Sequence, residues 1–138
     1  MSYVFTDEQI LGTLAEVVRE NPDKVYKIPE SMRFTSDDRS CFYVHKNEDG
    51  TKSPGCIVGQ VLHRLGVPLK DFKRAEGLGS NFAMSMLGIT GVGQETAGLL
   101  RKVQYYQDCG RSWSDALQRA LKEMENDYGA TVSLPVAA

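Results

Sequence analysis

The chain has 138 residues, of which 41% are hydrophobic and 25% are charged, and these values are typical of one globular domain. Sixteen Lys and Arg residues stand against 18 Asp and Glu residues, so the formal net charge at pH 7 is −2. This balance argues against a strongly basic nucleic-acid binder and against a polybasic membrane-surface protein.

The sequence predicts a cytoplasmic protein with reduced thiols. No run of about 18 apolar residues is present, so we expect no membrane span. Residues 1–8 lack the basic start and the long apolar stretch of a signal peptide. The three cysteines are an odd number without the spacing of a disulfide framework.

The first helix is predicted over residues 7–20. Thr6 and Gln9 have the spacing of a capping box, and Asn21-Pro22 ends the helical pattern. One apolar stripe with helical periodicity runs through the segment and consists of Ile10, Leu11, Leu14, Val17 and Val18.

A small antiparallel ribbon is expected next. Residues 25–28 alternate before a proline and suit a brief edge strand, whereas residues 31–39 are polar and suit a loop. Residues 41–45 are rich in aromatic and β-branched side chains, and Asp49-Gly50 then gives a strong turn signal.

The middle of the chain alternates between helical and irregular segments. Ser53-Pro54 is predicted to open a helix that ends at Gly66, and residues 69–73 suit one more helical turn. Residues 82–87 alternate like a strand but contain the Ala, Met and Leu that suit a helix, and we favour a short helix.

Two long helices are predicted to follow. The first runs from Thr90 or Gln94 to Gln107, and the second begins after Ser112 and stops at Gly129. The sequence therefore predicts an α+β, mainly helical fold, with four or five helices packed with one small antiparallel β-ribbon. We expect a single globular domain over residues 1–129 and a flexible C-terminal tail over residues 130–138.

Several stretches between residues 40 and 121 carry a resemblance to a known group of proteins. They are Cys41–Val44, Cys56–Val67, Leu99–Gln104, Gln107–Gly110 and Trp113–Ala116. Together they resemble small uncharacterised proteins encoded by bacteriophages of actinobacteria and by the genomes of their hosts. The group has no assigned activity, so the resemblance implies a phage accessory protein in the host cytoplasm and transfers no catalytic residue.

Cys41, His45, Cys56 and His63 are the only cluster in the sequence that could suggest zinc. On a strand, Cys41 and His45 would lie about 13 Å apart. On a helix, Cys56 and His63 would be separated by about 10.5 Å along the axis. Zinc needs four ligands around one point, so we expect no metal.

Cys56 is the better candidate for a reactive thiol. It falls in the first turn of a predicted helix, where the helix dipole stabilises a thiolate, and His45 on the preceding strand is the candidate for its base. The competing interpretation is a buried cysteine between Gly55 and Gly59, where the helix packs closely on the ribbon. We expect Cys56 to be buried and unreactive, and we keep a small thiol-dependent enzyme as an alternative.

No cofactor is expected, because the glycine-rich residues 77–82 and 88–93 match neither of the standard phosphate-binding motifs. Lys70, Lys73 and Arg74 form the densest basic group, but acidic residues interleave with them. We expect no nucleic-acid partner and keep a weak nucleic-acid binder through these three residues as a second alternative.

The function that remains is a small protein-interaction module rather than an enzyme. Its candidate binding residues are Phe82, Met84, Met86 and Tyr105, since interfaces favour aromatic and Met side chains. An extended 82–86 segment would direct Phe82, Met84 and Met86 to one side, and Tyr105 falls outside the apolar stripe of its helix. The expected partner is a host or phage protein, or a second copy of the chain. The competing interpretation places these side chains in the core.

Overall fold

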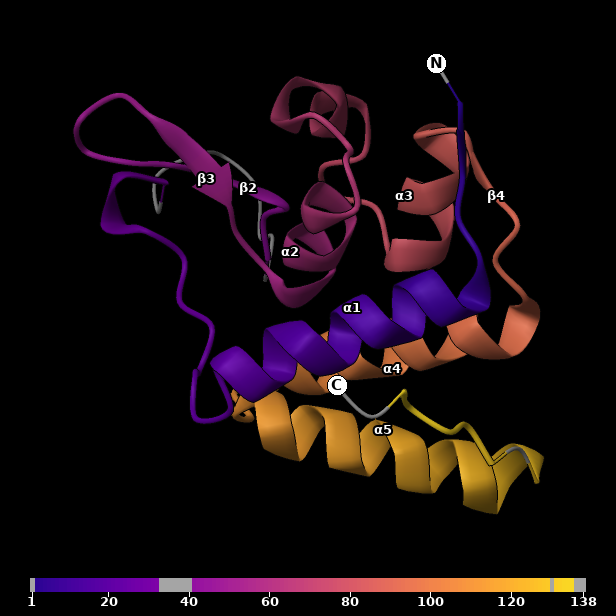
Figure 1. The fold of residues 1–138 in the computed structure, drawn as a ribbon. Coiled ribbons are helices and arrows are strands. Elements are labelled where there is room, and N and C mark those ends of the chain that lie inside the picture. The colour runs from indigo at the N-terminus through magenta and orange to yellow at the C-terminus, as the bar shows by residue number, and fades with distance from the viewer. Residues whose placement is uncertain (1, 33–40, 130, 136–138) are drawn as a thin grey trace.

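A computed structural model describes residues 2–32, 41–129 and 131–135, which form the mainly helical α+β fold that the sequence predicts (Figure 1). The helices of the described part are α1 (Asp7–Glu20), α2 (Ile57–Arg64), α3 (Ser80–Met86), α4 (Gln94–Asp108) and α5 (Trp113–Tyr128), with 3-10 turns at Glu30–Met32 and Leu69–Arg74. The strands are β1 (Tyr3–Val4), β2 (Val44–Lys46), β3 (Lys52–Pro54) and β4 (Ile89–Thr90). No helix in these ranges is long and apolar enough to cross a membrane.

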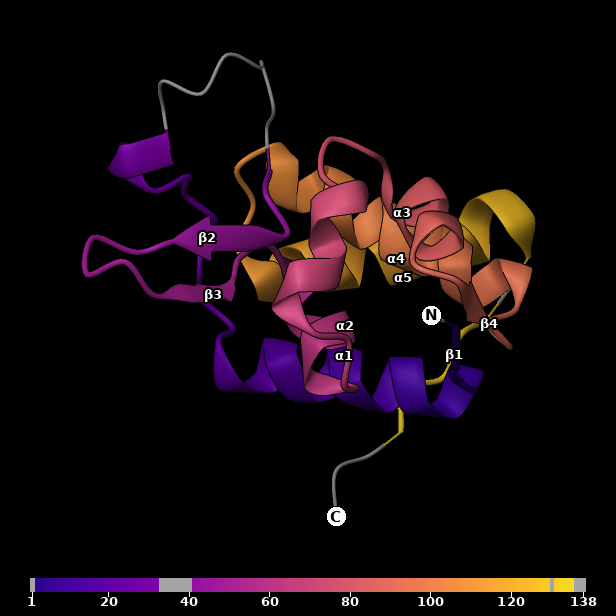
Figure 2. The same ribbon diagram turned by 90° about the horizontal axis from the view of Figure 1, so that it is seen from above.

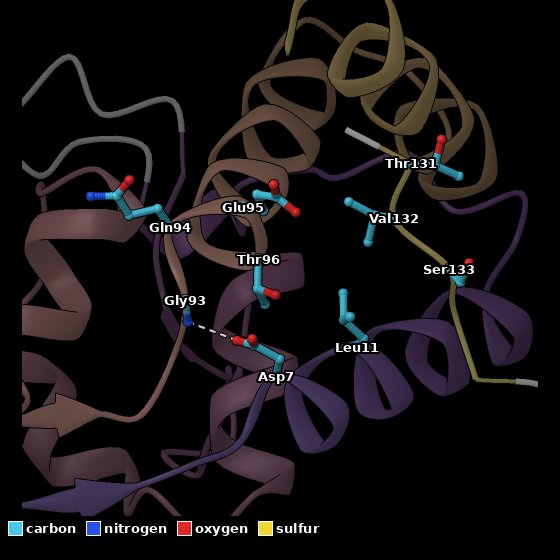
Figure 3. A pocket seen from close by; sticks show the side chains of 9 residues that line it. All are labelled: Asp7, Leu11, Gly93, Gln94, Glu95, Thr96, Thr131, Val132 and Ser133. Atoms are coloured by element: carbon cyan, nitrogen blue, oxygen red, sulfur yellow. Dashed lines mark hydrogen bonds between the residues drawn. The ribbon is translucent and has the colours of Figure 1, made fainter. Parts of the chain in front are cut away.

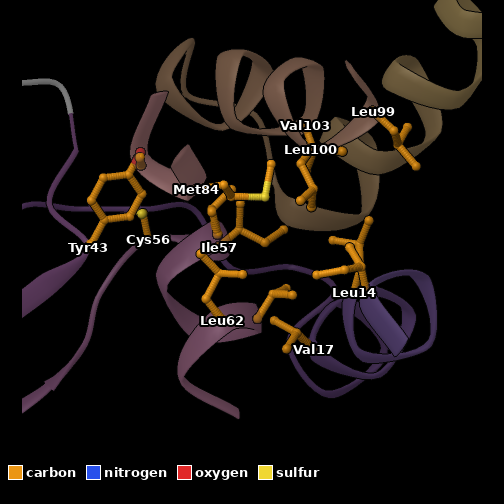
Figure 4. Packing of buried hydrophobic residues seen from close by; sticks show 14 of the residues in the cluster. Leu14, Val17, Tyr43, Cys56, Ile57, Leu62, Met84, Leu99, Leu100 and Val103 are labelled. Atoms are coloured by element: carbon orange, nitrogen blue, oxygen red, sulfur yellow. The ribbon is translucent and has the colours of Figure 1, made fainter. Parts of the chain in front are cut away.

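The core lies where α1, α2, α4 and α5 meet. α4 and α5 form an antiparallel pair, α1 packs against both of them, and α2 and α3 lie above this layer (Figure 1). The view from above shows the β2–β3 ribbon at one end of the molecule and the β1–β4 pair at the other (Figure 2). Figure 4 shows how side chains from α1, α2, α3 and α4 interdigitate in the centre.

The predicted boundaries of α1 and α5 are confirmed. At the start of α1, the Thr6 hydroxyl accepts a hydrogen bond from the Gln9 N–H at 3.1 Å, and the Gln9 side chain accepts one from the Thr6 N–H at 2.9 Å. The Ser112 hydroxyl caps α5 by accepting from the Asp115 N–H at 3.2 Å. Gly129 ends α5 with a φ of +62°, which glycine adopts without strain.

The edge strand expected over residues 25–28 is not formed. Only Val25 makes a bridge, and its partner is Ser112, just before α5. The segment before Val25 pairs with the start of α5 and not with another strand, because the first N–H groups of that helix need acceptors. The Trp113 N–H donates to the Lys24 carbonyl and the Ser114 N–H donates to the Pro22 carbonyl, both at 2.9 Å. The loop expected at 31–39 lies mostly outside the described residues.

The antiparallel ribbon is confirmed, but the helix predicted to open at Ser53-Pro54 begins later. Pro54 pairs with Val44 at the end of β3. The extended pairing then continues, because the Gly55 N–H donates to the Tyr43 carbonyl at 2.8 Å and the Cys56 N–H donates to the Phe42 carbonyl at 2.9 Å. α2 therefore starts only at Ile57.

Two features at the chain ends were not anticipated. β1 and β4 form a parallel two-strand pair in which Tyr3 is opposite Ile89. In the segment expected to be a flexible tail, Val132 and Leu134 are half-buried against the core, and the chain runs back beside α1 (Figure 1). Residues 130 and 136–138 of that expected tail lie outside the described part.

Candidate functional site

Two buried glutamines of α4 satisfy the start of α2. The first N–H groups of a helix have no partner within the helix. The Gln107 side-chain oxygen accepts from the Ile57 N–H at 2.8 Å, and that of Gln104 accepts from the Val58 N–H at 3.4 Å. Both glutamine side chains are buried, so these contacts replace water as the cap of α2. Sequence analysis did not identify either residue.

The same cluster brings two thiols together. Cys56 is the N-cap residue of α2 and is fully buried, as expected, with 0% of its surface exposed. The Gln104 amide nitrogen donates to the Cys41 sulfur at 2.7 Å and to the Cys56 sulfur at 3.2 Å. A hydrogen bond between the two thiols and the burial of Cys41 raise the pKa of Cys41 well above its usual range.

His45 contacts a tyrosine, whereas the thiol-enzyme alternative would pair it with Cys56. Its Nε2 atom lies 2.7 Å from the Tyr26 hydroxyl, which also accepts from the Phe42 N–H at 2.8 Å. Burial, with a smaller contribution from Lys24, lowers the pKa of His45 to about 4. Cys56 is therefore out of reach of a substrate and has no hydrogen bond with the histidine that the alternative assigns as its base.

The depressed pKa of His45 predicts that stability falls in mild acid. The ordinary pKa of histidine is near 6.5. Between about pH 6.5 and pH 4, the His45 ring is therefore protonated in the unfolded chain and neutral in the folded chain. The free energy of unfolding should be constant above this window and fall as pH decreases through it. Because His45 is only half-buried, solvent screens part of this effect, and we expect a loss of about 1 kcal/mol at pH 5.

Urea unfolding at pH 7.5 and pH 5 measures this loss, and His45→Gln is the comparison variant. The variant should lose about 1 kcal/mol less than the parent between the two pH values, because glutamine does not titrate. An equal loss in both proteins would show that the pH dependence comes from other groups.

The described residues hold no group of three His, Cys, Asp or Glu side chains that could bind a metal ion. Of the four zinc candidates, the structure brings Cys41 and Cys56 together through Gln104. The two histidines are engaged elsewhere. His45 contacts Tyr26, and the Nδ1 atom of His63 lies 3.0 Å from the Val67 carbonyl oxygen, beyond the far end of α2.

α3 presents an exposed apolar face. The helix prediction for residues 82–87 is confirmed, so the extended alternative, with Phe82, Met84 and Met86 on one side, is wrong. A helix places residues four apart on the same face. Phe82 is 71% exposed and Met86 is 50% exposed, whereas Met84 is buried among the core residues (Figure 4).

Tyr105 is 61% exposed, as its position outside the stripe predicted. Its ring meets that of Tyr106 edge to face, with centroids 5.2 Å apart. Tyr105 lies near the C-terminal end of α4, so it belongs to a different helix from the Phe82–Met86 face.

A groove of about 520 Å³ lies between α3, α4 and α5. Asn81 borders it on the α3 side, Gly98 and Met124 contribute from α4 and α5, and Tyr128 and Arg101 also line it. Asn81 precedes Phe82 directly, so the groove adjoins the exposed residues of α3.

A second cavity, of about 550 Å³, separates the starts of α1 and α4 from the C-terminal segment (Figure 3). The Asp7 carboxylate accepts from the Gly93 N–H at 2.7 Å and thereby caps α4 from α1. Glu95 also lines the cavity. An anion would meet two carboxylates here, so the cavity favours no phosphate group.

The basic residues Lys70, Lys73 and Arg74 are exposed on the 3-10 turn after α2. The same turn carries Asp71, whose carboxylate accepts from the Tyr3 hydroxyl at 2.7 Å. The turn therefore presents both signs of charge.

Comparison of the chain with known protein families, with curated proteins and with solved structures finds no match. The functional argument therefore rests on the geometry of the described residues alone.

Proposed function

We propose that this protein is an interaction module that binds a segment of a partner protein across α3 and the adjoining groove. The observation that carries the proposal is the exposure of Phe82 and Met86, one helical turn apart, on a helix whose opposite side is buried. Aromatic and Met side chains are enriched in the centres of interfaces. Their shared face gives α3 the apolar anchor that a binding surface needs.

The groove extends this anchor into a larger surface. Gly98 leaves space on α4, since an added Cβ would meet the Met124 side chain only at an ordinary contact distance of 3.7 Å. Tyr128 is 61% exposed beside this space. An apolar side chain of a partner can therefore lie in the groove beside Met124 and Tyr128 while its neighbours contact Phe82.

The groove carries both signs of charge, and the place that favours a carboxylate of the partner is beside Arg101. Lys102 is paired with Glu123 at 3.2 Å, whereas within the described residues the exposed Arg101 and Glu95, six positions apart on α4, have no ion-pair partner. A stable dimer buries about 800 Å² on each partner, more than a seven-residue helix can cover. These features favour a short segment of a different protein over a second copy of the chain. We propose, in line with the resemblance of the sequence to phage proteins, that the partner is a host or phage protein in an infected bacterium.

The double variant Phe82→Ala, Met86→Ala should abolish capture of the partner while leaving the melting temperature unchanged. Both side chains are exposed, so their truncation removes contacts with the partner and little of the core. A partner that the parent protein captures from host lysate is identified by mass spectrometry and then purified, and its Kd is measured for each variant. We expect at least a tenfold loss for the double variant and a further loss for Arg101→Glu.

Two control variants bracket this result. Val25→Ala truncates an exposed apolar residue on another part of the surface and should leave the Kd unchanged. Met84→Ala removes a buried side chain of α3 and should lower the melting temperature by several degrees. An unchanged Kd for the double variant would contradict the proposal, and so would self-association that the double variant abolishes, because the occupant would then be a second copy.

A further inference from the structure

We infer that Cys41 and Cys56 form a reversible intramolecular disulfide when a peroxide oxidises the protein. The Gln104 amide nitrogen donates to both sulfurs, at 2.7 Å to Cys41 and at 3.2 Å to Cys56, so the two sulfurs lie around one shared donor. The inference rests on this cluster alone and is independent of the binding surface on α3.

The backbone already holds the two cysteines side by side. The Cys56 N–H donates to the carbonyl of Phe42, the residue after Cys41, at 2.9 Å. Directly opposite residues of paired strands have Cα atoms about 4.5–5.5 Å apart, within the range of about 4.4–6.8 Å that a disulfide spans, and Cys41 is the next residue along the chain from Phe42. The backbone pairing therefore brings the two cysteines near each other, and the shared contact with Gln104 brings their sulfurs together.

Unequal exposure assigns the two thiols different roles. Cys41 is partly exposed, whereas Cys56 is fully buried. A small oxidant such as hydrogen peroxide therefore meets Cys41 first, and Cys56 is the thiol that resolves the product. Cys109 is exposed at the end of α4 and takes no part in the pair.

The reaction proceeds in two balanced steps. The Cys41 thiolate attacks one oxygen of hydrogen peroxide, the O–O bond breaks, and the departing hydroxide takes up the proton that Cys41 released to give water and a sulfenic acid on Cys41. The Cys56 sulfur then attacks the Cys41 sulfur, the S–O bond breaks, and hydroxide leaves with the Cys56 proton as a second water. Two electrons pass from the thiols to the peroxide, and a dithiol reductant reverses the change.

The rate should depend on pH in a definite direction. The hydrogen bond with Cys56 and the burial of the site raise the pKa of Cys41, so little of it is thiolate at pH 7. Because the thiolate is the attacking species, oxidation should be slow at pH 7 and accelerate as pH rises toward 9.

The test uses the full chain with Cys109→Ser, which keeps pairing between molecules out of the measurement. After treatment with hydrogen peroxide at pH 8, trypsin should release residues 40–46 joined to residues 53–64, and dithiothreitol should separate them. The bond closes a loop of about 15 residues, so the melting temperature of the oxidised protein should rise by about 5–10 °C. The variants Cys41→Ala and Cys56→Ala, each with Cys109→Ser, should show neither change.

The joined peptide forms from native residues, so its detection does not depend on whether the alanine variants fold. The inference is overturned if Cys41 and Cys56 both remain open to alkylation in denaturant after peroxide treatment. It is equally overturned if Cys41 proceeds to a sulfinic acid without forming the joined peptide.

Discussion

Gly59→Ala is expected to destabilise the protein by about 3 kcal/mol, although alanine is the better helix former by about 1 kcal/mol. Gly59 lies within α2, where the helix crosses the ribbon. A Cβ added there would lie 2.5 Å from the Tyr43 carbonyl oxygen and 3.1 Å from its carbonyl carbon. Because both atoms belong to backbone, no side-chain rotation relieves the clash, and α2 must move away from the ribbon.

Gly12→Ala is the matched control, because Gly12 is also a glycine inside a helix. A Cβ added to Gly12 would meet only the Pro135 side chain, at an ordinary distance of 3.8 Å. This variant should therefore be more stable than the parent by about 0.5–1 kcal/mol. Guanidinium unfolding monitored through Trp113 measures both effects. Similar values for the two variants would show that close packing at Gly59 has no special cost.

The sequence predicted those helices whose starts and stops have their own chemistry. α1 and α5 each combine an N-cap side chain, an apolar stripe and a stop signal within one stretch of chain, and their bounds were predicted to the residue. The start of α2 was misplaced because backbone pairing with Phe42 and Tyr43 extends the strand past Pro54. Whether Gly55 and Cys56 are extended or helical is therefore decided by their pairing with Tyr43 and Phe42, more than ten positions away in the chain.

The β1–β4 pair shows the same limit more strongly. Each strand has two residues, and Tyr3 and Ile89 come together only because α3 and α1 position the chain segments beside them. A two-residue strand has no measurable periodicity. Such pairing can be recognised only once the packing of the helices is known.

The candidate site was predicted in part. The burial of Cys56 was predicted from the close packing expected at Gly55 and Gly59, and the exposure of Tyr105 was predicted from its position outside an apolar stripe. Both are confirmed. Met84 was wrongly grouped with Phe82 and Met86. On a strand these three side chains would point to the same side, but on a helix Met84 points away from the other two. The meeting of Cys41 with Cys56 could not be foreseen, because it depends on where the strand ends and α2 begins.

Gln107 carried a signal that sequence analysis did not use. It follows Val103 by four residues and therefore lies on the stripe of α4 that faces the core. A polar residue on a buried stripe requires a hydrogen-bond partner. Its partner, the Ile57 N–H, is 50 residues away in the chain, so the sequence can indicate that Gln107 is buried but not what it binds.

Gln107→Leu is expected to destabilise the protein by about 3 kcal/mol. The substitution keeps a similar volume but leaves the Ile57 N–H, the first of α2, without its acceptor at 2.8 Å, and a buried unsatisfied donor costs about 1–3 kcal/mol. Ile57 is fully buried, so we expect the upper end of this range. Gln118→Leu makes the same replacement on the exposed side of α5 and should change the free energy of unfolding by less than about 0.5 kcal/mol.

Native-state hydrogen exchange distinguishes a lost cap from a general loss of packing. In Gln107→Leu, the amides of Ile57 and Val58 should exchange faster than the free energy of global unfolding predicts. Amides in the middle of α1 should exchange at the rate that this free energy predicts. Cys56 adjoins Ile57, so local opening of the first turn of α2 should also speed its reaction with iodoacetamide. An equal increase of exchange in α1 and at the start of α2 would mean that Gln107 stabilises the fold as a whole and does not act as the cap of α2.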